Sequence, residues 1–280
     1  ESDNIKNYIS AYKNEIKLKK NKLKVKYEKN KVILNGSSEF YIQENIKNII
    51  DFNLKKVNDL ISFETFINLS NIDFKVDEIS YLKRANSNVG LEIKGSTNQN
   101  KIFLKKINYI EDKNKIEIDN LKIENNKISS LDKIIFNYLT KNNFKNHLTL
   151  LRTKNNYELT GKSYDAENLI EIISSSNENK NFFNIFNNLN SKIKIEIDNT
   201  RLDEINEIYN LKGLLNVKNS KISTLDLFSN FSESEKISLS IKLDKDKKTI
   251  TNFYSDRAKP FVKKYKFIKG FEDGNIIFNS

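Results

Sequence analysis

The sequence predicts a mainly β fold with a few short helices, in which an extended, twisted antiparallel meander curls into an open groove. Two observations predict it. Apolar and polar residues alternate with a period of two along most of the chain, as expected of strands with one apolar and one solvated face. Short clusters of Asn, Asp and Gly separate these runs, which is typical of tight turns. One-sided strands favour an antiparallel sheet, because parallel sheets are normally buried on both faces.

The expected strands follow the clearest alternating runs. These lie at 23–27, 63–69, 72–76, 89–93, 116–123, 193–197 and 237–243. Within 116–123 the alternation changes phase, because Ile116 and Ile118 are followed by Leu121 and Ile123. Asn tolerates a positive φ, so we expect it to replace the scarce glycine in the turns.

Helical spacing occurs in only a few places. Apolar residues at positions 5, 8, 9, 12 and 16 predict an amphipathic helix within residues 1–20. Asp165 and Asp256 precede apolar clusters and are predicted to cap the N-termini of two short helices, at 165–176 and 256–267. A further apolar helix is predicted at 182–189.

An internal repeat is predicted within the elongated body at 21–280. The hexapeptide Lys-Ile-Ser-Ser-Leu-Asp at 127–132 recurs with one substitution at 221–226, and Asp165 aligns with Asp256. The pattern of each copy predicts several strands followed by a capped helix. The copies cover about 114–173 and 208–265. A period of about 90 residues is longer than solenoid repeats, so we expect a multi-strand unit.

The composition excludes several classes of protein. The 280 residues include no Cys, no Met, no Trp and one His, so disulfides, thiolate metal sites and cysteine nucleophiles are excluded. We therefore expect no metal and no cofactor. No apolar run approaches the ~20 residues of a membrane-spanning helix. The missing Met favours a processed chain or an internal segment of a longer protein.

The net charge of +11 raises the possibility of a nucleic-acid partner. The excess is lysine, with 44 Lys and four Arg, and the lysines are spread along the chain without a basic block. Because 44 Asn and 38 Ile accompany them, the lysines are better explained by an AT-rich coding bias. Nonspecific nucleic-acid binding is therefore a third alternative, and no specific nucleic-acid partner is expected.

The sequence offers only weak candidates for catalytic residues, so an enzyme is the least favoured hypothesis. His147 lies in an alternating run, and the sequence nominates no nucleophile or acid to accompany it. Ser163 and Ser255 lack the glycines of a nucleophile elbow. Acidic pairs that suit turns and solvated faces occur at Asp73/Asp77, Asp244/Asp246 and Glu272/Asp273.

The apolar face of the strands is the candidate site. A one-sided meander must be covered by a second sheet, by closure into a barrel, by helices or by an apolar ligand. If the face stays open, a lipid acyl chain would gain roughly 0.8 kcal/mol per buried CH₂ there. The residues predicted to line the groove are Ile116, Ile118, Leu121, Ile123, Ile193, Ile195, Ile197, Leu215, Val217, Ile237, Leu239, Ile241, Ile250 and Ile276.

Three segments resemble the AsmA-like superfamily. Residues 250–278 are similar to its recurring unit, in which a strand leads into a Ser-Asp-x-Ala helix and a glycine then opens the next strand. Residues 159–170 look like its Gly-x-Ser-x-Asp-Ala-x-x-Leu step, and Tyr81-Leu82-Lys83 is similar to the YhdP-type branch. The usual Gly-Gly before the final strand is Asp273-Gly274 here, and the helix carries Pro260.

The resemblance, which covers about residues 20–280, implies a repeating β-groove of the YhdP and TamB type. Such proteins are tethered to the inner membrane of Gram-negative-type bacteria and extend through the periplasm. The resemblance therefore implies a non-catalytic conduit or scaffold that binds phospholipid acyl chains during transport to the outer membrane and outer-membrane biogenesis. The alternative from a different class is a β-rich surface or adhesin-like binding module with a closed core.

Overall fold

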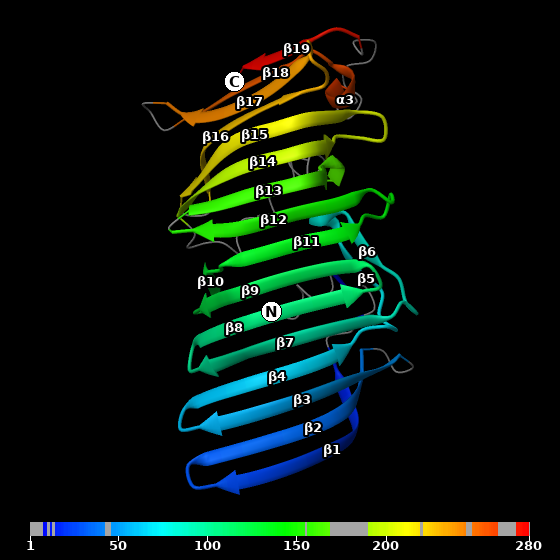
Figure 1. Cartoon of the computed structure of the whole chain (residues 1–280), viewed down its shortest axis with the longest axis vertical. Helices are drawn as coiled ribbons and strands as arrows, with labels where there is room; N and C mark the ends of the chain where they lie inside the picture. Colours follow the sequence, from blue (N-terminus) through cyan, green and yellow to red (C-terminus); the bar gives the residue numbers. More distant parts are fainter. Residues whose placement is uncertain are drawn as a thin grey trace. The chain divides into compact units, whose positions relative to one another are not determined.

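The computed structural model of the chain describes residues 8, 9, 12, 15–42, 46–154, 156–168, 190–218, 221–244, 248–262 and 273–279. The chain divides into two compact units, Glu1–Lys141 and Asn142–Ser280. Strands dominate both units (Figure 1), so the predicted mainly β fold is confirmed. The first predicted repeat copy, 114–173, spans the boundary between the two units.

Unit 1 is a meander with one short insertion. Its elements are β1 (Lys17–Glu28), β2 (Lys31–Tyr41), β3 (Lys47–Val57), β4 (Leu60–Asn68), β5 (Phe74–Val76), the 3₁₀ turn η1 (Asp77–Ile79), β6 (Tyr81–Lys83), β7 (Val89–Asn98), β8 (Lys101–Glu111), β9 (Asn114–Glu124), β10 (Lys127–Ser130) and β11 (Lys133–Leu139). Successive strands pair antiparallel from β1 to β4, then β4 pairs with β7. The order continues through β8 to β9, which pairs with both β10 and β11. The inserted β5 and β6 pair with each other.

Unit 2 continues the same construction. Its elements are β12 (Lys145–Thr153), β13 (Asn156–Asp165), β14 (Ser191–Arg201), β15 (Glu207–Lys218), β16 (Lys221–Asn230), β17 (Lys236–Leu243), β18 (Thr249–Ser255), α3 (Lys259–Val262) and β19 (Ile276–Asn279). Each strand pairs with the next. The pairing of β13 with β14 is parallel, unlike the predicted antiparallel order. Parallel neighbours need a crossover of a dozen or more residues, and residues 166–190 supply that length.

Asparagine carries the backbone positions that glycine usually occupies. Among the described residues, eight of the thirteen non-glycine positions with positive φ are Asn. Asn30 and Asn125 lie in turns between strands, whereas Asn120 lies inside β9 with a φ of 54°. Asn120 lies at the change of phase within 116–123, and the register of β8 with β9 is the same on both sides of it.

The helix predictions are only partly described by the structure. Lys17–Lys20 belong to β1, so the predicted helix at 1–20 is wrong at its C-terminal end, where the alternation of the strand already begins. Of the predicted helix at 165–176, Asp165 ends β13, Ala166 is not helical, Glu167 and Asn168 are helical, and 169–176 lie outside the described residues, as does the predicted helix at 182–189. Within the predicted helix at 256–267, the described helical residues are Lys259–Val262.

Candidate apolar binding faces

The register of unit 1 brings all four of its predicted lining residues onto one face of the sheet. Ile118 is paired with Ile107, and Leu121 is paired with Leu104. Lys105 and Asn120 lie opposite each other between these two pairs, so the alternation changes phase in both strands at the same place and both pairs point to the same side. This surface, apolar face 1, also includes Leu23, Val25, Tyr27, Leu34, Phe52, Leu54, Phe63, Ile67, Leu91, Ile93, Ile102, Tyr109, Ile116, Ile123, Ile134 and Phe136.

The register of unit 2 likewise collects its predicted lining residues on one face, with one exception. This surface, apolar face 2, contains Leu150, Leu159, Ile193, Ile195, Ile197, Leu211, Leu215, Val217, Leu225, Leu227, Ile237, Leu239, Ile241, Phe253 and Ile276. Glycines replace a side chain at Gly161 and Gly213 within this array. A Cβ at either position would collide with a leucine on the neighbouring strand.

Ile250 is the exception, and its prediction as a lining residue is wrong. It pairs with Lys242, whereas the neighbouring pair of Leu239 and Phe253 points to the opposite side. Ile250 is accordingly exposed, and Phe253 packs its ring 4.7 Å from that of Phe261 in α3. Strand β18 carries large apolar residues on both faces, so alternation alone could not fix its phase.

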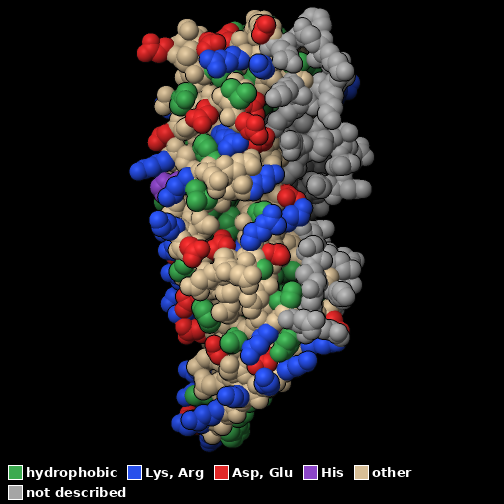
Figure 2. Space-filling view, turned by 90° about the vertical axis from the view of Figure 1, so that its right-hand side faces the viewer, with side chains coloured by type: hydrophobic (Ala, Val, Ile, Leu, Met, Phe, Trp, Pro, Cys, Tyr) green, Lys and Arg blue, Asp and Glu red, His purple; other side chains and the backbone are tan. Residues whose placement is uncertain are grey.

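The opposite face of unit 1 carries charges of both signs in close pairs. Lys94 Nζ lies 2.6 Å from a carboxylate oxygen of Glu64 and 2.8 Å from one of Glu92. Lys115 Nζ lies 2.6 Å from Glu117, and this hydrogen bond lowers the pKa of the Glu117 carboxyl. On the side of the molecule shown in Figure 2, basic and acidic side chains are interspersed in the same way.

One end of apolar face 1 is covered by the β5–η1–β6 insertion, and we call it the covered end. Tyr81 of β6 is 2 % exposed and packs its ring edge-on against Tyr109 and Tyr138. Phe74 of β5 meets the ring of Tyr109 at a centroid distance of 5.7 Å. The insertion thus forms a cluster with Val89 and the strand ends around it, and Figure 1 shows β5 and β6 at this end of the strands.

Buried polar groups fix the insertion to the sheet. The Tyr81 hydroxyl donates to the Glu111 carboxylate and lies 2.7 Å from the Tyr109 hydroxyl. Burial raises the pKa of both tyrosines. The Lys83 ammonium is fully buried and donates to the carbonyls of Leu69, Ser70 and Ile72 at 2.7 Å each. Desolvation of this cation lowers the pKa of Lys83.

The other end of apolar face 1 lies at the opposite termini of the strands, and we call it the open end. Six of its side chains are half-buried, whereas Leu121, which pairs with one of them, Leu104, is 8 % exposed. The face becomes progressively more exposed toward β1, where Leu23 is 60 % exposed and Tyr27 is 76 % exposed. The open end comprises Leu34, Leu54, Phe63, Ile102, Leu104 and Ile123.

One end of apolar face 2 is also closed by a local cluster. Leu202, Ile208, Phe231 and Ile237 are buried there, with Phe261 of α3 packed against them. Val217 and Leu225, nearer the other strand termini, are buried as well. Apolar face 2 is therefore more buried along its length than the open end of apolar face 1.

The two predicted helix caps have different roles. Asp165 is buried at the end of β13, and its carboxylate accepts the N–H of Glu167 at 3.2 Å, where helical residues begin. Asp256 accepts the N–H of Lys236 at 2.6 Å and the hydroxyl of Tyr254. Asp256 therefore ties the end of β18 to the start of β17, and among the described bonds it makes none to α3, so its prediction as a cap is wrong.

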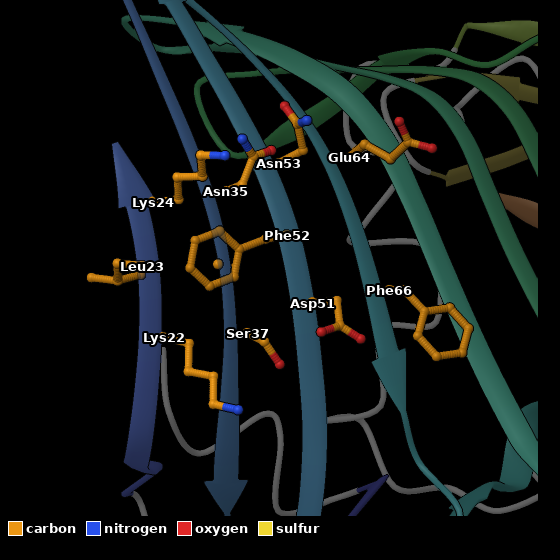
Figure 3. Close-up of a pocket in the computed structure, with 11 residues that line it drawn as sticks. Lys22, Leu23, Lys24, Asn35, Ser37, Asp51, Phe52, Asn53, Glu64 and Phe66 are labelled. Carbon is orange, nitrogen blue, oxygen red and sulfur yellow. The ribbon is translucent and has the colours of Figure 1, made fainter. Parts of the chain in front are cut away.

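A shallow hollow of about 550 Å³ is lined by residues of strands β1 to β4. Its floor is the backbone around Gly36, and its walls include Lys22, Lys24, Asp51 and Phe66. In Figure 3, Leu23 points away from the side on which Lys22 and Lys24 lie. Leu23 and Phe52, which belong to apolar face 1, are also among the residues that line the hollow.

The described residues among the weak catalytic candidates take part in strand pairing or in local hydrogen bonds. His147 in β12 pairs with Ser163, whose hydroxyl donates to the Lys145 carbonyl at 2.6 Å. The Ser255 hydroxyl donates to the Arg257 carbonyl at 2.7 Å. Among the acidic pairs, Asp73 accepts the N–H of Ala85 and Asp244 accepts the N–H of Lys248. Asp77 forms an ion pair with Lys75. Asp246 and Glu272 lie outside the described residues.

Two further searches cover the part of the chain that the structure describes. Within it, no three His, Cys, Asp or Glu side chains gather as metal ligands would. No described helix has the length and apolar composition needed to span a bilayer.

Sequence reasoning missed the aromatic and aliphatic residues that β2 to β4 contribute to apolar face 1. Phe52, Leu54 and Phe63 belong to it, although their strands alternate as clearly as β9 does. The pattern around Phe63 was sufficient to find them, because Thr65 and Ile67 continue the same phase.

Comparison of the chain with protein-family models, with curated proteins and with solved structures found no match in any of the three.

Proposed function

We propose that the chain is a non-catalytic conduit or scaffold that binds phospholipid acyl chains on its apolar faces. In this proposal it works in the periplasm, tethered to the inner membrane through the full-length protein, and supports lipid transport to the outer membrane. The proposed location and the proposed transport to the outer membrane come from the resemblance to the AsmA-like superfamily. The proposed ligand class, an acyl chain, comes from the apolar surface of the sheet.

The observation that supports the ligand class is the open end of apolar face 1. Six large apolar side chains from β2, β3, β4, β8 and β9 lie side by side there and remain only half-buried. Their unburied area leaves hydrophobic free energy to be gained by a ligand, at about 25 cal/mol per Å². An acyl chain suits this surface because it is long, apolar and requires no hydrogen bonds from the protein.

The arrangement of charge supports a phospholipid over a wholly apolar ligand. Lysines and carboxylates occupy the other face of the same strands, so the sheet separates an apolar side from a solvated side. A head group at the rim of the sheet would stay in water while its chains lie on the face. Binding of this kind depends on apolar area and needs no catalytic group.

Strand β4 offers a matched pair of positions for the test. Phe63 lies on apolar face 1, whereas Phe66, three residues later, lies on the polar face. The chain contains no Trp, so Phe63→Trp and Phe66→Trp each introduce a single fluorophore. Phospholipids brominated on their acyl chains should quench the Phe63→Trp variant and leave the Phe66→Trp variant nearly unchanged.

Unit 2 provides an independent test with photo-crosslinking side chains. Ile195 lies on apolar face 2 and Lys194, its neighbour in β14, lies on the opposite face. A crosslinker at position 195 should capture phospholipid, and one at position 194 should not. Equal capture at both positions, or equal quenching of both Trp variants, would exclude the proposed faces. No capture and no quenching at any position would favour a binding module with a closed core.

A further inference from the structure

The outer edge of β1 is a surface of unit 1 that the proposed function does not use. Among the described residues, 22–28 pair only with residues 31–37 of β2. Eleven of the twelve residues in β1 are exposed, and within the described ranges no strand other than β2 pairs with it. Exposed strand edges of this length are templates for pairing with another strand.

The two faces of this edge have opposite character. Leu23, Val25 and Tyr27 are 60 %, 62 % and 76 % exposed and continue apolar face 1. Lys22 and Lys24 point to the other side, where they form a wall of the hollow shown in Figure 3. Strand β1 contains six lysines and one glutamate, so its polar side is strongly cationic.

A bulge limits the straight part of the edge. The register with β2 shifts between Lys19 and Lys22, and Lys20 has a φ of 50°. The bulge turns the strand and interrupts the pairing, which resumes between Lys17–Lys19 and Glu39–Tyr41. The seven residues from 22 to 28 therefore form the usable edge, about 23 Å long at ~3.3 Å per residue.

We infer that residues 22–28 dock an extended segment of another protein in which acidic and apolar residues alternate. The partner's main chain bonds to the open edge of β1, which extends the sheet by one strand. Its acidic side chains lie opposite Lys22, Lys24 and Lys26, and its apolar side chains lie opposite Leu23, Val25 and Tyr27. Each face of β1 thus meets a complementary face of the added strand.

Other occupants fit this edge less well. A second copy of β1 would place lysine against lysine, which is unfavourable for directly opposed residues. The exposed edge of β19 offers four residues, Ile276–Asn279, and none of them is acidic. A bilayer would leave the open backbone N–H and C=O groups unsatisfied in hydrocarbon.

Seven-residue blocked peptides test the inference without lipid. The first probe alternates Glu and Val, the second alternates Lys and Val, and the third is the first with N-methyl groups on alternate residues. Anisotropy of a labelled probe should show the Glu–Val peptide binding at least about tenfold more tightly than the Lys–Val peptide. The N-methylated probe should bind weakly, because it cannot form the main-chain ladder.

A charge reversal in the protein provides the decisive comparison. The double variant Lys22→Glu/Lys24→Glu should prefer the Lys–Val peptide over the Glu–Val peptide. The control Lys192→Glu/Lys218→Glu changes the net charge equally at exposed positions of β14 and β15, and should keep the original preference. A gain of Lys–Val binding cannot come from misfolding, so the reversal remains interpretable if the variant is less stable.

Hydrogen exchange locates the bound peptide. Amides of β1 that point away from β2 should become protected when the Glu–Val peptide is present. The inference is overturned if the N-methylated probe binds equally well, if both double variants behave alike, or if protection appears elsewhere. It is also overturned if no peptide binds while vesicles containing an anionic lipid bind through Lys22 and Lys24, because the edge would then serve a membrane surface.

Discussion

The covered and open ends of apolar face 1 use similar side chains and share strands β8 and β9, but they differ in what lies over them. At the covered end the β5–η1–β6 insertion buries Tyr81 and Val89 almost completely. At the open end Leu54 and Phe63 remain half-buried. A one-sided sheet can therefore have its packed core at one end of the strands and leave apolar surface for a ligand at the other.

Polar contacts sharpen this difference. The covered end contains a buried cation, Lys83, and a buried carboxylate, Glu111, each with hydrogen-bond partners. Buried polar groups with complete partners specify one arrangement of the elements around them. The open end is built from aliphatic and aromatic side chains, which tolerate ligands of varied length and position.

Removal of the central ring at the covered end should have the largest effect. We expect Tyr81→Ala to lower the free energy of unfolding by about 3–5 kcal/mol, because it empties a packed aromatic cluster and removes one of the hydrogen-bond donors to Glu111. The matched control is Tyr27→Ala, which removes the same ring from an exposed position. Its cost should stay within ~0.5 kcal/mol. Denaturant unfolding of both variants measures the difference, and equal costs would remove the distinction between core and exposed edge.

Removal of the buried cation should be the next largest effect. Lys83→Met keeps the apolar length of the side chain and deletes the donor to three carbonyls. We expect a loss of about 2–4 kcal/mol, because those carbonyls lose their charged partner in a buried site. Lys24→Met, at an exposed position, is the control and should be nearly neutral. If Lys83→Met proves as stable as the wild type, the cation does not hold the insertion in place.

Alkaline pH should weaken the covered end through Tyr81 and Tyr109. Burial raises the pKa of both hydroxyls above their ordinary value near 10, so the folded chain retains protons that the unfolded chain releases. Their contribution is complete below pH 10 and is lost as pH rises above it, by roughly 1.4 kcal/mol per pH unit for each tyrosine. Lys83, whose pKa is lowered, acts in the opposite direction just below its ordinary pKa, so variants must be compared at each pH.

The measurement is denaturant unfolding between pH 8 and 11. Tyr81→Phe should remove about half of the alkaline slope. Tyr27→Phe, which alters an exposed ring, should leave the slope unchanged. An identical slope in all three proteins would mean that the buried hydroxyls do not govern alkaline stability.

Much of the fold could be predicted from the sequence because alternation records which side chains share a face. The phase change between Ile118 and Leu121 is a clear case, since it marks the position of Asn120, whose positive φ interrupts the regular strand. The direction of a strand leaves no such trace, so the parallel pairing of β13 and β14 was not predicted. The phase of β18 also required its partner, because Ile250 and Phe253 compete for the inward face.

The covered end could not be predicted for a different reason. Lysine normally indicates a solvated position, and nothing local in the sequence shows that Lys83 is enclosed by three carbonyls. The contacts of Tyr81 with Tyr109 and Tyr138 join strands that are far apart in the chain. The candidate binding surface was therefore easier to predict than the structure that closes one end of it.

Changes at the open end should have the smallest effect on stability and the largest effect on lipid binding. Leu54 lies between Leu34 and Phe63 in the register, with its side chain half-buried. We expect Leu54→Ser to cost about 1–2 kcal/mol of unfolding free energy, less than Tyr81→Ala, because part of its area is already in water. The same change should reduce quenching of the Phe63→Trp fluorophore by brominated phospholipid, since it places a hydroxyl beside the acyl chain. If Leu54→Ser instead destabilises the chain as strongly as Tyr81→Ala, the open end is packed core, and the two ends of the face do not differ in the way proposed.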